Sequence, residues 1–144
     1  MQHDPFGNLV DWGEALDRFE ELVDSGRLAE CQPGLIRVLR FKGNWRLREE
    51  VLKHAGEIQT PTIALISEVL SILADDNVYY DARVMAGDAL IDLLKNVHAE
   101  KTDEMVWGVK KVVEKLMHTI HPPFFDDALS RVHEKILAPY ALEN

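Results

Sequence analysis

The stretch 60–94 constrains the fold of this chain more than any other part of the sequence. Its first half is almost wholly apolar and ends in an acidic turn at residues 75–77. Small and apolar residues then recur every three or four positions, a spacing that keeps side chains on one face of a helix. This second half reads Ala82-Arg83-x-x-Ala86-x-x-Ala89-Leu90. The stretch therefore predicts two helices joined by a short turn and packed antiparallel.

The same helical spacing recurs along most of the chain, and no alternating strand pattern of useful length interrupts it. We therefore expect an all-α fold of about seven helices in antiparallel pairs. The helix that follows Thr60-Pro61 is apolar nearly all round, which predicts that its neighbours enclose it at the centre of the molecule. With 144 residues, of which 47% are apolar, residues 1–144 are expected to form one domain with a continuous core.

Short polar side chains and prolines predict where several helices begin. Asn8 and Asn44 precede apolar helical patterns and are expected to accept backbone N–H groups as N-caps. Pro33 and Pro61 are expected as first helical residues. Asp76 or Asn77 is expected to cap the fifth helix. The sixth helix is expected to begin after Thr102, and the seventh at Pro122-Pro123.

Composition also bears on location and on membranes. No apolar run approaches the roughly 18 residues that a membrane span needs. The first residues lack the basic region and apolar run of a secretory signal, so we expect a cytoplasmic protein. The single cysteine, Cys31, excludes an internal disulfide and is expected as a small interior residue.

The charge is strongly acidic but uneven. A net charge of -9 argues against broad binding of nucleic acid, which needs clustered Lys and Arg. Residues 37–54 nevertheless hold six basic and two acidic residues, between acidic segments at 1–32 and 57–104. The basic segment either binds an anion or neutralises the acidic helices beside it, and we favour neutralisation.

A repeat appears when the segments are aligned. Arg48 and Arg83 lie 35 residues apart, each in the second helix of a predicted pair. This layout resembles the HEAT repeat, in the wider group of HEAT and armadillo proteins. The match is best over 60–95 and weaker over 33–58 and 102–138. The resemblance implies a short right-handed α-solenoid of stacked helix pairs, used to bind proteins rather than to catalyse reactions.

The resemblance also implies a structural role for the repeated arginines. In the family, the arginine typically reaches an aspartate in the turn of a neighbouring repeat, which gives a ladder of charge-assisted hydrogen bonds. Here that ladder would join Arg48 and Arg83 to Asp75 or Asp76. Removing Arg83 should then cost roughly 1–3 kcal/mol, because it leaves a turn carboxylate without its partner.

Candidate binding residues are aromatic, basic or acidic groups beside the predicted turns. Exposed aromatic and arginine side chains are favoured as anchors in interfaces. Neighbouring helical residues point about 100° apart, so one of the two adjacent tyrosines is expected to be partly exposed. An acidic row along the fifth helix is a further candidate surface, although such rows are more often solvated. The candidates are Trp45, Arg46, Tyr79, Tyr80, Asp81, Asp88 and Asp92.

A protein-binding scaffold or adaptor without catalytic activity, cofactor or metal is the favoured function, with a protein as the partner. One alternative is an acidic inhibitor or immunity-type protein that masks a basic partner. A second is a metal-dependent enzyme, and a third is nucleic-acid binding through residues 37–54. The metal site of that enzyme would be a C-terminal cluster of His118, His121, Asp126 and His133. The spacing of this cluster does not match the zinc-protease motif.

Overall fold

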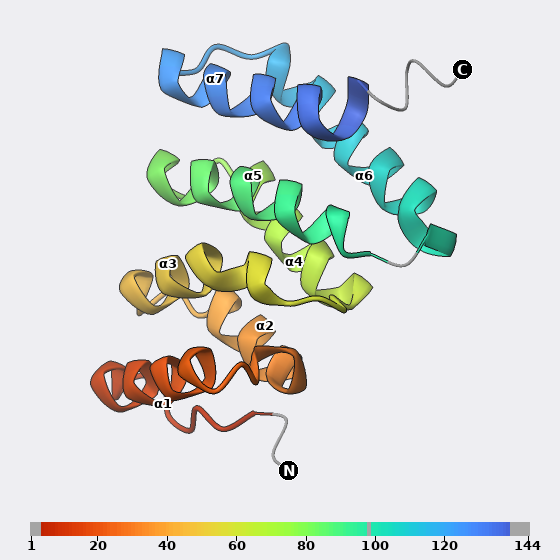
Figure 1. Cartoon of the computed structure of the whole chain (residues 1–144). Helices are drawn as coiled ribbons and strands as arrows, with labels where there is room; N and C mark the ends of the chain where they lie inside the picture. The colour runs from red at the N-terminus through yellow and green to blue at the C-terminus, as the bar shows by residue number, and fades with distance from the viewer. Residues whose placement is uncertain (1–3, 98, 139–144) are drawn as a thin grey trace.

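The computed structural model describes residues 4–97 and 99–138, which form seven α-helices and no β-strand (Figure 1). The all-α class and the number of helices are therefore confirmed. The helices are α1 (Trp12–Asp24), α2 (Gln32–Arg40), α3 (Trp45–His54), α4 (Ile63–Ala74), α5 (Tyr80–Lys95), α6 (Ala99–Met117) and α7 (Pro123–Val132). Short helical turns at Leu28–Cys31, Ala55–Glu57 and His133–Leu137 extend α2, α3 and α7.

The helices lie in two stacked rows (Figure 1). In one row α1 packs on α3, α3 on α5 and α5 on α7, and in the other α2 packs on α4 and α4 on α6. The colours of Figure 1 show that α1, α3, α5 and α7 all begin at the left side of the view and run to the right. Four helix starts therefore lie along a single edge of the molecule.

The apolar helix α4 lies in the middle, as its sequence predicts. It packs against α2, α5 and α6, and Leu65, Val69 and Leu73 have no exposed surface. Across from them, α5 contributes Ala82 and Ala86, which are also fully buried. Their short side chains let the two helices approach closely, which maintains the dense packing typical of protein interiors.

Asn44 caps its helix as predicted, but two other starts differ from the prediction. The Asn44 side chain accepts a hydrogen bond from the Leu47 N–H at 3.0 Å. Asn8 does not cap α1, which begins only at Trp12, because its side chain closes a local turn with the Val10 N–H at 3.0 Å. Pro33 occupies the second position of α2, since Gln32 is already helical.

The starts of α4, α5 and α6 also correct the prediction. Thr62 caps α4 with a 3.1 Å bond from the Leu65 N–H, so Pro61 lies in the preceding loop. Neither Asp76 nor Asn77 caps α5, which begins at Tyr80 without a side-chain cap. The sixth helix starts at Ala99, which places Thr102 inside it.

Two findings concern the predictions made for Cys31 and for membrane-spanning segments. Cys31 is 1% exposed, so its predicted interior position is confirmed, and burial raises the pKa of its thiol. Among residues 4–97 and 99–138, no helix combines the length and the apolar character required to cross a bilayer.

Asp4 fastens the N-terminal segment to α2, and this contact predicts a pH dependence. Its carboxylate accepts hydrogen bonds from Nε and Nη2 of Arg37, at 2.6 and 2.9 Å. The Arg37 bond holds the pKa of Asp4 below its ordinary value. A carboxyl group with a lowered pKa in the folded state stabilises the fold above its unfolded pKa, and this stability is lost as pH falls through the folded pKa.

Asp4→Asn should therefore lower the free energy of unfolding by up to about 1 kcal/mol at pH 7, as expected for a partly exposed ion pair. The gap between variant and native chain should shrink as pH falls from about 4 to about 2. Urea unfolding of both chains at pH 7 and at low pH measures the gap. An equal gap at both pH values would contradict this account of the contact.

Candidate functional site

Arg48 and Arg83 occupy equivalent places in α3 and α5, and both are buried, at 7% and 2% exposure. Arg48 donates from Nη2 to the Phe41 carbonyl oxygen at 3.4 Å, directly after α2. Arg83 donates from Nε to the Leu73 carbonyl oxygen at 3.0 Å, in the last turn of α4. Each arginine therefore binds the carboxyl end of the helix that precedes it, where backbone carbonyls lack helical partners.

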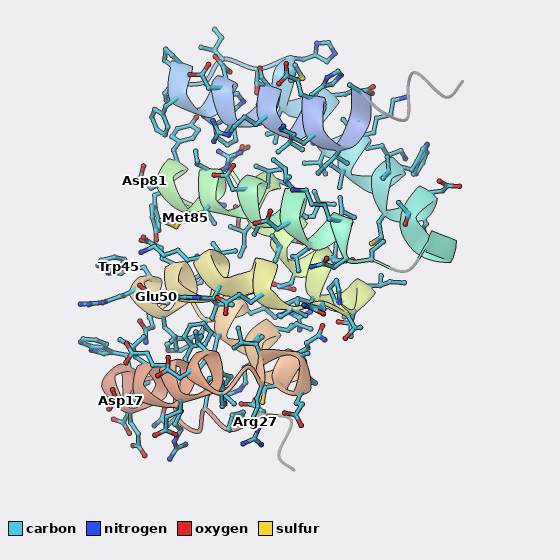
Figure 2. All side chains as sticks on the ribbon, in the orientation of Figure 1. Asp17, Arg27, Trp45, Glu50, Asp81 and Met85 are labelled. Atoms are coloured by element: carbon cyan, nitrogen blue, oxygen red, sulfur yellow. The ribbon has the colours of Figure 1, made fainter. Side chains whose placement is uncertain are left out.

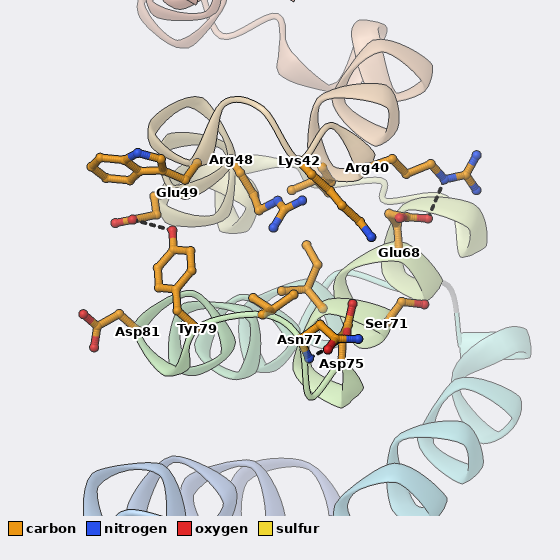
Figure 3. A pocket seen from close by; sticks show the side chains of 14 residues that line it. Arg40, Lys42, Arg48, Glu49, Glu68, Ser71, Asp75, Asn77, Tyr79 and Asp81 are labelled. Carbon is orange, nitrogen blue, oxygen red and sulfur yellow. Dashed lines mark hydrogen bonds and ion pairs between the residues drawn. The ribbon is translucent and has the colours of Figure 1, made fainter.

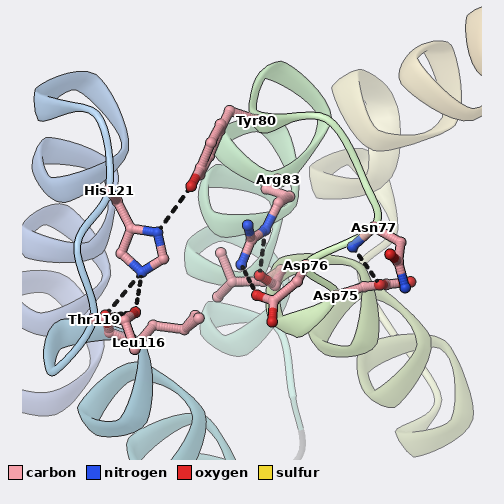
Figure 4. Close-up of polar contacts among 9 residues, drawn as sticks. Asp75, Asp76, Asn77, Tyr80, Arg83, Leu116, Thr119 and His121 are labelled. Carbon is pink, nitrogen blue, oxygen red and sulfur yellow. Dashed lines mark hydrogen bonds and ion pairs between the residues drawn. The ribbon is translucent and has the colours of Figure 1, made fainter.

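The turn aspartates of the expected ladder make few contacts with these arginines. Arg83 Nη2 lies 3.6 Å from an oxygen of Asp76, whose side chain is 86% exposed (Figure 4). Asp75 instead accepts a hydrogen bond from the backbone N–H of Asn77 at 2.8 Å. In the described ranges, no ion pair joins Arg48 to a carboxylate. The arginines are held mainly by backbone carbonyls rather than by turn aspartates.

Arg83 also belongs to a cluster that joins α5 to the last helices. Its guanidinium lies 5.2 Å from the ring centre of Tyr80 and 4.5 Å from that of Phe125. The Tyr80 hydroxyl hydrogen-bonds to Nδ1 of His121 at 3.0 Å, and Nε2 of His121 lies 2.9 Å from the Leu116 carbonyl oxygen (Figure 4). Cation–π and hydrogen bonds thus fix the junction of α6 and α7 against α5.

The C-terminal histidines were considered as metal ligands. His121 is instead engaged by Tyr80 and by the end of α6, as described above. Within the described part of the chain, no group of three or more His, Cys, Asp or Glu side chains could hold a metal ion. The structure thus does not assemble His118, His121, Asp126 and His133 into a metal site.

Exposed aromatic side chains gather where the first-row helices begin. Trp12 and Trp45 are the first residues of α1 and α3, Tyr79 directly precedes α5, and Phe124 is the second residue of α7. Their exposures are 48%, 60%, 41% and 47% in that order. Figure 2 shows Trp45 projecting from this side of the molecule. We call these four residues the aromatic edge.

The aromatic edge is continuous from α1 to α7. Three contacts join neighbouring helix starts: Arg46 lies 5.8 Å from the Trp12 ring, the Tyr79 hydroxyl donates to Glu49 at 2.6 Å, and the Tyr80 and Phe124 rings lie 5.9 Å apart. Tyr80 itself is half-buried, so Tyr79 is the more exposed tyrosine of the pair. Sequence reasoning missed Trp12 and Phe124. Phe124 directly follows the predicted start at Pro122-Pro123, which was a usable signal, whereas Trp12 lies four residues after the predicted cap Asn8.

A groove with a volume of about 730 Å³ opens between two turns near the centre of this edge (Figure 3). The turn between α2 and α3 forms one wall, and the turn between α4 and α5 forms the other. Trp45 and Tyr79, both exposed, are among its lining residues. Burial, and then the hydrogen bond to Glu49, raise the pKa of the Tyr79 phenol well above its ordinary value. Tyr79 therefore stays protonated at neutral pH and donates to Glu49.

Three basic and four acidic side chains line the groove: Arg40, Lys42, Arg48, Glu49, Glu68, Asp75 and Asp81. Most of them are already paired. Arg40 Nε lies 2.8 Å from a carboxylate oxygen of Glu68, whose side chain is only 15% exposed. Lys42 is exposed and has no partner among residues 4–97 and 99–138. The groove thus retains unpaired positive charge on one wall.

The basic segment 37–54 is largely neutralised by its neighbours. Three of its six bases pair with acids: Arg37 with Asp4 at 2.6 Å, Arg40 with Glu68 at 2.8 Å, and Lys53 with Glu50 at 3.4 Å. Arg48 is buried and Arg46 lies over a tryptophan ring. Little of the segment is left as the clustered positive surface that a phosphate backbone needs.

The acidic row on α5 is divided between local partners. Asp88 accepts from Arg131 at 3.2 Å, and Asp92 lies 3.9 Å from Lys95. Asp81 is exposed and lines the groove. The row therefore does not present one uniform acidic face.

Comparison with known proteins yields no relative. The chain matches no protein-family model, no curated protein and no solved structure. The resemblance to HEAT repeats thus remains a prediction, and the function is inferred from the residues and the geometry described above.

Proposed function

We propose that this chain is a HEAT-like scaffold or adaptor that binds a partner protein along the aromatic edge and has no catalytic activity of its own. The observation that carries the proposal is the placement of four exposed aromatic residues at four parallel helix starts. A run of large exposed aromatic side chains on a monomer marks an interaction surface more often than chance. Such residues combine a large apolar area with few rotatable bonds, which suits them as anchors.

The two stacked rows of helices support the HEAT-like part of the proposal. Solenoids of this kind contact mainly neighbouring repeats and present long surfaces to their partners. The pairwise packing of α1, α3, α5 and α7 is consistent with this scheme. A cytoplasmic location is also part of the proposal, because a chain with one buried cysteine suits a reducing compartment.

The chemistry of the edge favours an acidic partner over a basic one. Lys42 is unpaired in the described structure, and Arg46 stands beside the two tryptophans of the edge. Asp88 and Asp92, which a basic partner would use, already have local partners. The inhibitor that masks a basic protein is therefore the weaker alternative.

Two tryptophans with the same exposure provide a matched test. Trp45 and Trp107 are both 60% exposed, but only Trp45 lies on the aromatic edge, whereas Trp107 lies on α6. We expect Trp45→Ala to weaken binding of a partner captured from the native host by about 30-fold or more, the loss typical of an interface anchor. Trp107→Ala should change the affinity by less than about twofold. Calorimetric titration of the purified partner measures both.

A charge reversal beside Trp45 extends the test. Arg46→Glu should slow association with an acidic partner, and the effect should diminish at high salt. Unfolding of each variant, followed by circular dichroism, controls for damage to the fold. If Trp45→Ala and Trp107→Ala weaken binding equally, or if neither does, the aromatic edge is not the docking surface.

A further inference from the structure

Arg48 carries a positive charge for which the described part of the chain supplies no counter-ion. The residue is 7% exposed, and its Nε is buried without a hydrogen-bond partner. Among residues 4–97 and 99–138, its side chain makes one hydrogen bond, the 3.4 Å contact from Nη2 to the Phe41 carbonyl oxygen. Burying a charge without an opposite charge is strongly unfavourable, so such a group marks a place where a ligand can complete the pairing.

The equivalent arginine of the next helix pair shows what Arg48 lacks. Arg83 has a 3.0 Å bond to a carbonyl oxygen, a carboxylate at 3.6 Å, and two aromatic rings against its guanidinium. No aromatic ring contact is found for Arg48 in the described structure, and its carbonyl contact is longer. Each arginine keeps one buried nitrogen without a hydrogen bond, Nε in Arg48 and Nη2 in Arg83. Only for Arg83 does the described structure supply a nearby carboxylate and aromatic rings.

Arg48 and Lys42 face the same groove. Figure 3 shows both side chains pointing into the space between the two turns. Arg48 is buried, whereas Lys42 is exposed. Three of the four acids of the lining are already engaged, since Glu68 pairs with Arg40, Glu49 accepts from Tyr79, and Asp75 accepts from the backbone N–H of Asn77. The fourth acid, Asp81, points away from the two cations (Figure 3). Arg48 and Lys42, for which the described residues supply no carboxylate partner, therefore line one cavity together with Trp45 and Tyr79.

We infer that this groove binds the carboxylate side chain of an extended acidic segment in a partner protein. Arg48 and Lys42 hold the carboxylate, while Trp45 and Tyr79 contact the residues beside it. The inference rests on the docking function proposed above and adds the chemistry of the partner. A volume of about 730 Å³ is in the range of peptide and small-ligand pockets, enough for a few residues in an extended conformation.

The charges of the lining favour a carboxylate over a phosphate. Four acidic and three basic side chains line the groove, so a dianion meets more repulsion than a single negative charge does. The planar guanidinium of Arg48 also matches the two oxygens of a carboxylate. A glutamate or aspartate in a partner is therefore the favoured ligand.

The test uses the full chain and a pair of peptides blocked at both ends, acetyl-Leu-Glu-Leu-amide and acetyl-Leu-Gln-Leu-amide. The observable is the Nε–Hε signal of Arg48 in a nitrogen–proton NMR spectrum, and the same signal of Arg83 is the internal control. We expect the Glu peptide to shift the Arg48 signal in a saturable way, with at least about tenfold weaker binding of the Gln peptide, which lacks the charge. Lys42→Gln, a change at an exposed residue, should weaken binding of the Glu peptide and leave the Gln peptide unaffected.

Other results would overturn the inference. Tighter binding of inorganic phosphate than of the Glu peptide would make the groove a phosphate site. Equal binding of the two peptides would show that only apolar contacts matter, and an unmoved Arg48 signal would show that the fold or water satisfies this arginine. If partner binding still depends on Trp45 in any of these cases, the docking function stands and only the carboxylate assignment fails.

Discussion

Arg83→Ala is expected to lower the free energy of unfolding by about 2–4 kcal/mol, the range for emptying a well-packed buried site. The side chain is 2% exposed and lies against the rings of Tyr80 and Phe125. Its removal leaves a cavity between α5 and α7, and it leaves the Leu73 carbonyl oxygen without its side-chain donor. Urea unfolding of the variant and the native chain measures the loss.

Two further variants separate packing from charge at this position. Arg83→Met retains most of the side-chain volume against the rings, so we expect a loss of only about 1 kcal/mol for the missing hydrogen bond. Asp76→Asn should cost less than about 0.5 kcal/mol, because the Asp76 side chain is 86% exposed. If Asp76→Asn destabilises as much as Arg83→Ala, the ion pair is the stabilising element and this account is wrong.

Arg48→Met is expected to stabilise the fold, whereas Arg83→Ala destabilises it. The free energy of unfolding should rise by about 1–2 kcal/mol. Replacing a buried charge by an apolar group of similar length is often stabilising when the charge has no good partner. Arg48 meets this condition, since its Nε has no hydrogen-bond partner in the described part of the chain and the substitution removes a single long contact, the 3.4 Å bond to the Phe41 carbonyl oxygen. The same urea unfolding experiment measures the gain.

The same substitution should abolish the response to the Glu peptide. A residue whose removal stabilises the fold while it destroys binding is retained for function rather than for stability. If Arg48→Met instead destabilises as much as Arg83→Met or more, Arg48 is a scaffold residue like its counterpart. The account therefore predicts that the same substitution to Met stabilises the fold at Arg48 and destabilises it at Arg83, although the two positions are equivalent.

Much of the fold is predictable from the sequence because apolar periodicity decides which faces are buried. The spacing in 60–94 predicts both helices of that pair, and the all-round apolar pattern predicts the central place of α4. The helix starts are less predictable, because short polar side chains near a helix can also bond to their own turn. Asn8 and Asp75 each bond to a backbone N–H two residues ahead and cap no helix.

The candidate site is only partly predictable for a different reason. Trp45 and Tyr79 stand out singly, but nothing in the spacing shows that residues 12, 45, 79 and 124 share an edge. That depends on four helices running parallel, which is a property of the packing. The resemblance to HEAT repeats implies the Arg–Asp ladder, yet backbone carbonyls at the ends of α2 and α4 compete for the same arginines.

Amide hydrogen exchange of the chain, with and without the captured partner, tests the central claim most directly. The account predicts new protection in the first turns of α1, α3, α5 and α7 and in the turns at 41–44 and 75–79. These segments surround the aromatic edge and the groove. Protection confined to α6 around Trp107, or to the last turns of α3 and α5 with the helix starts unchanged, would contradict it.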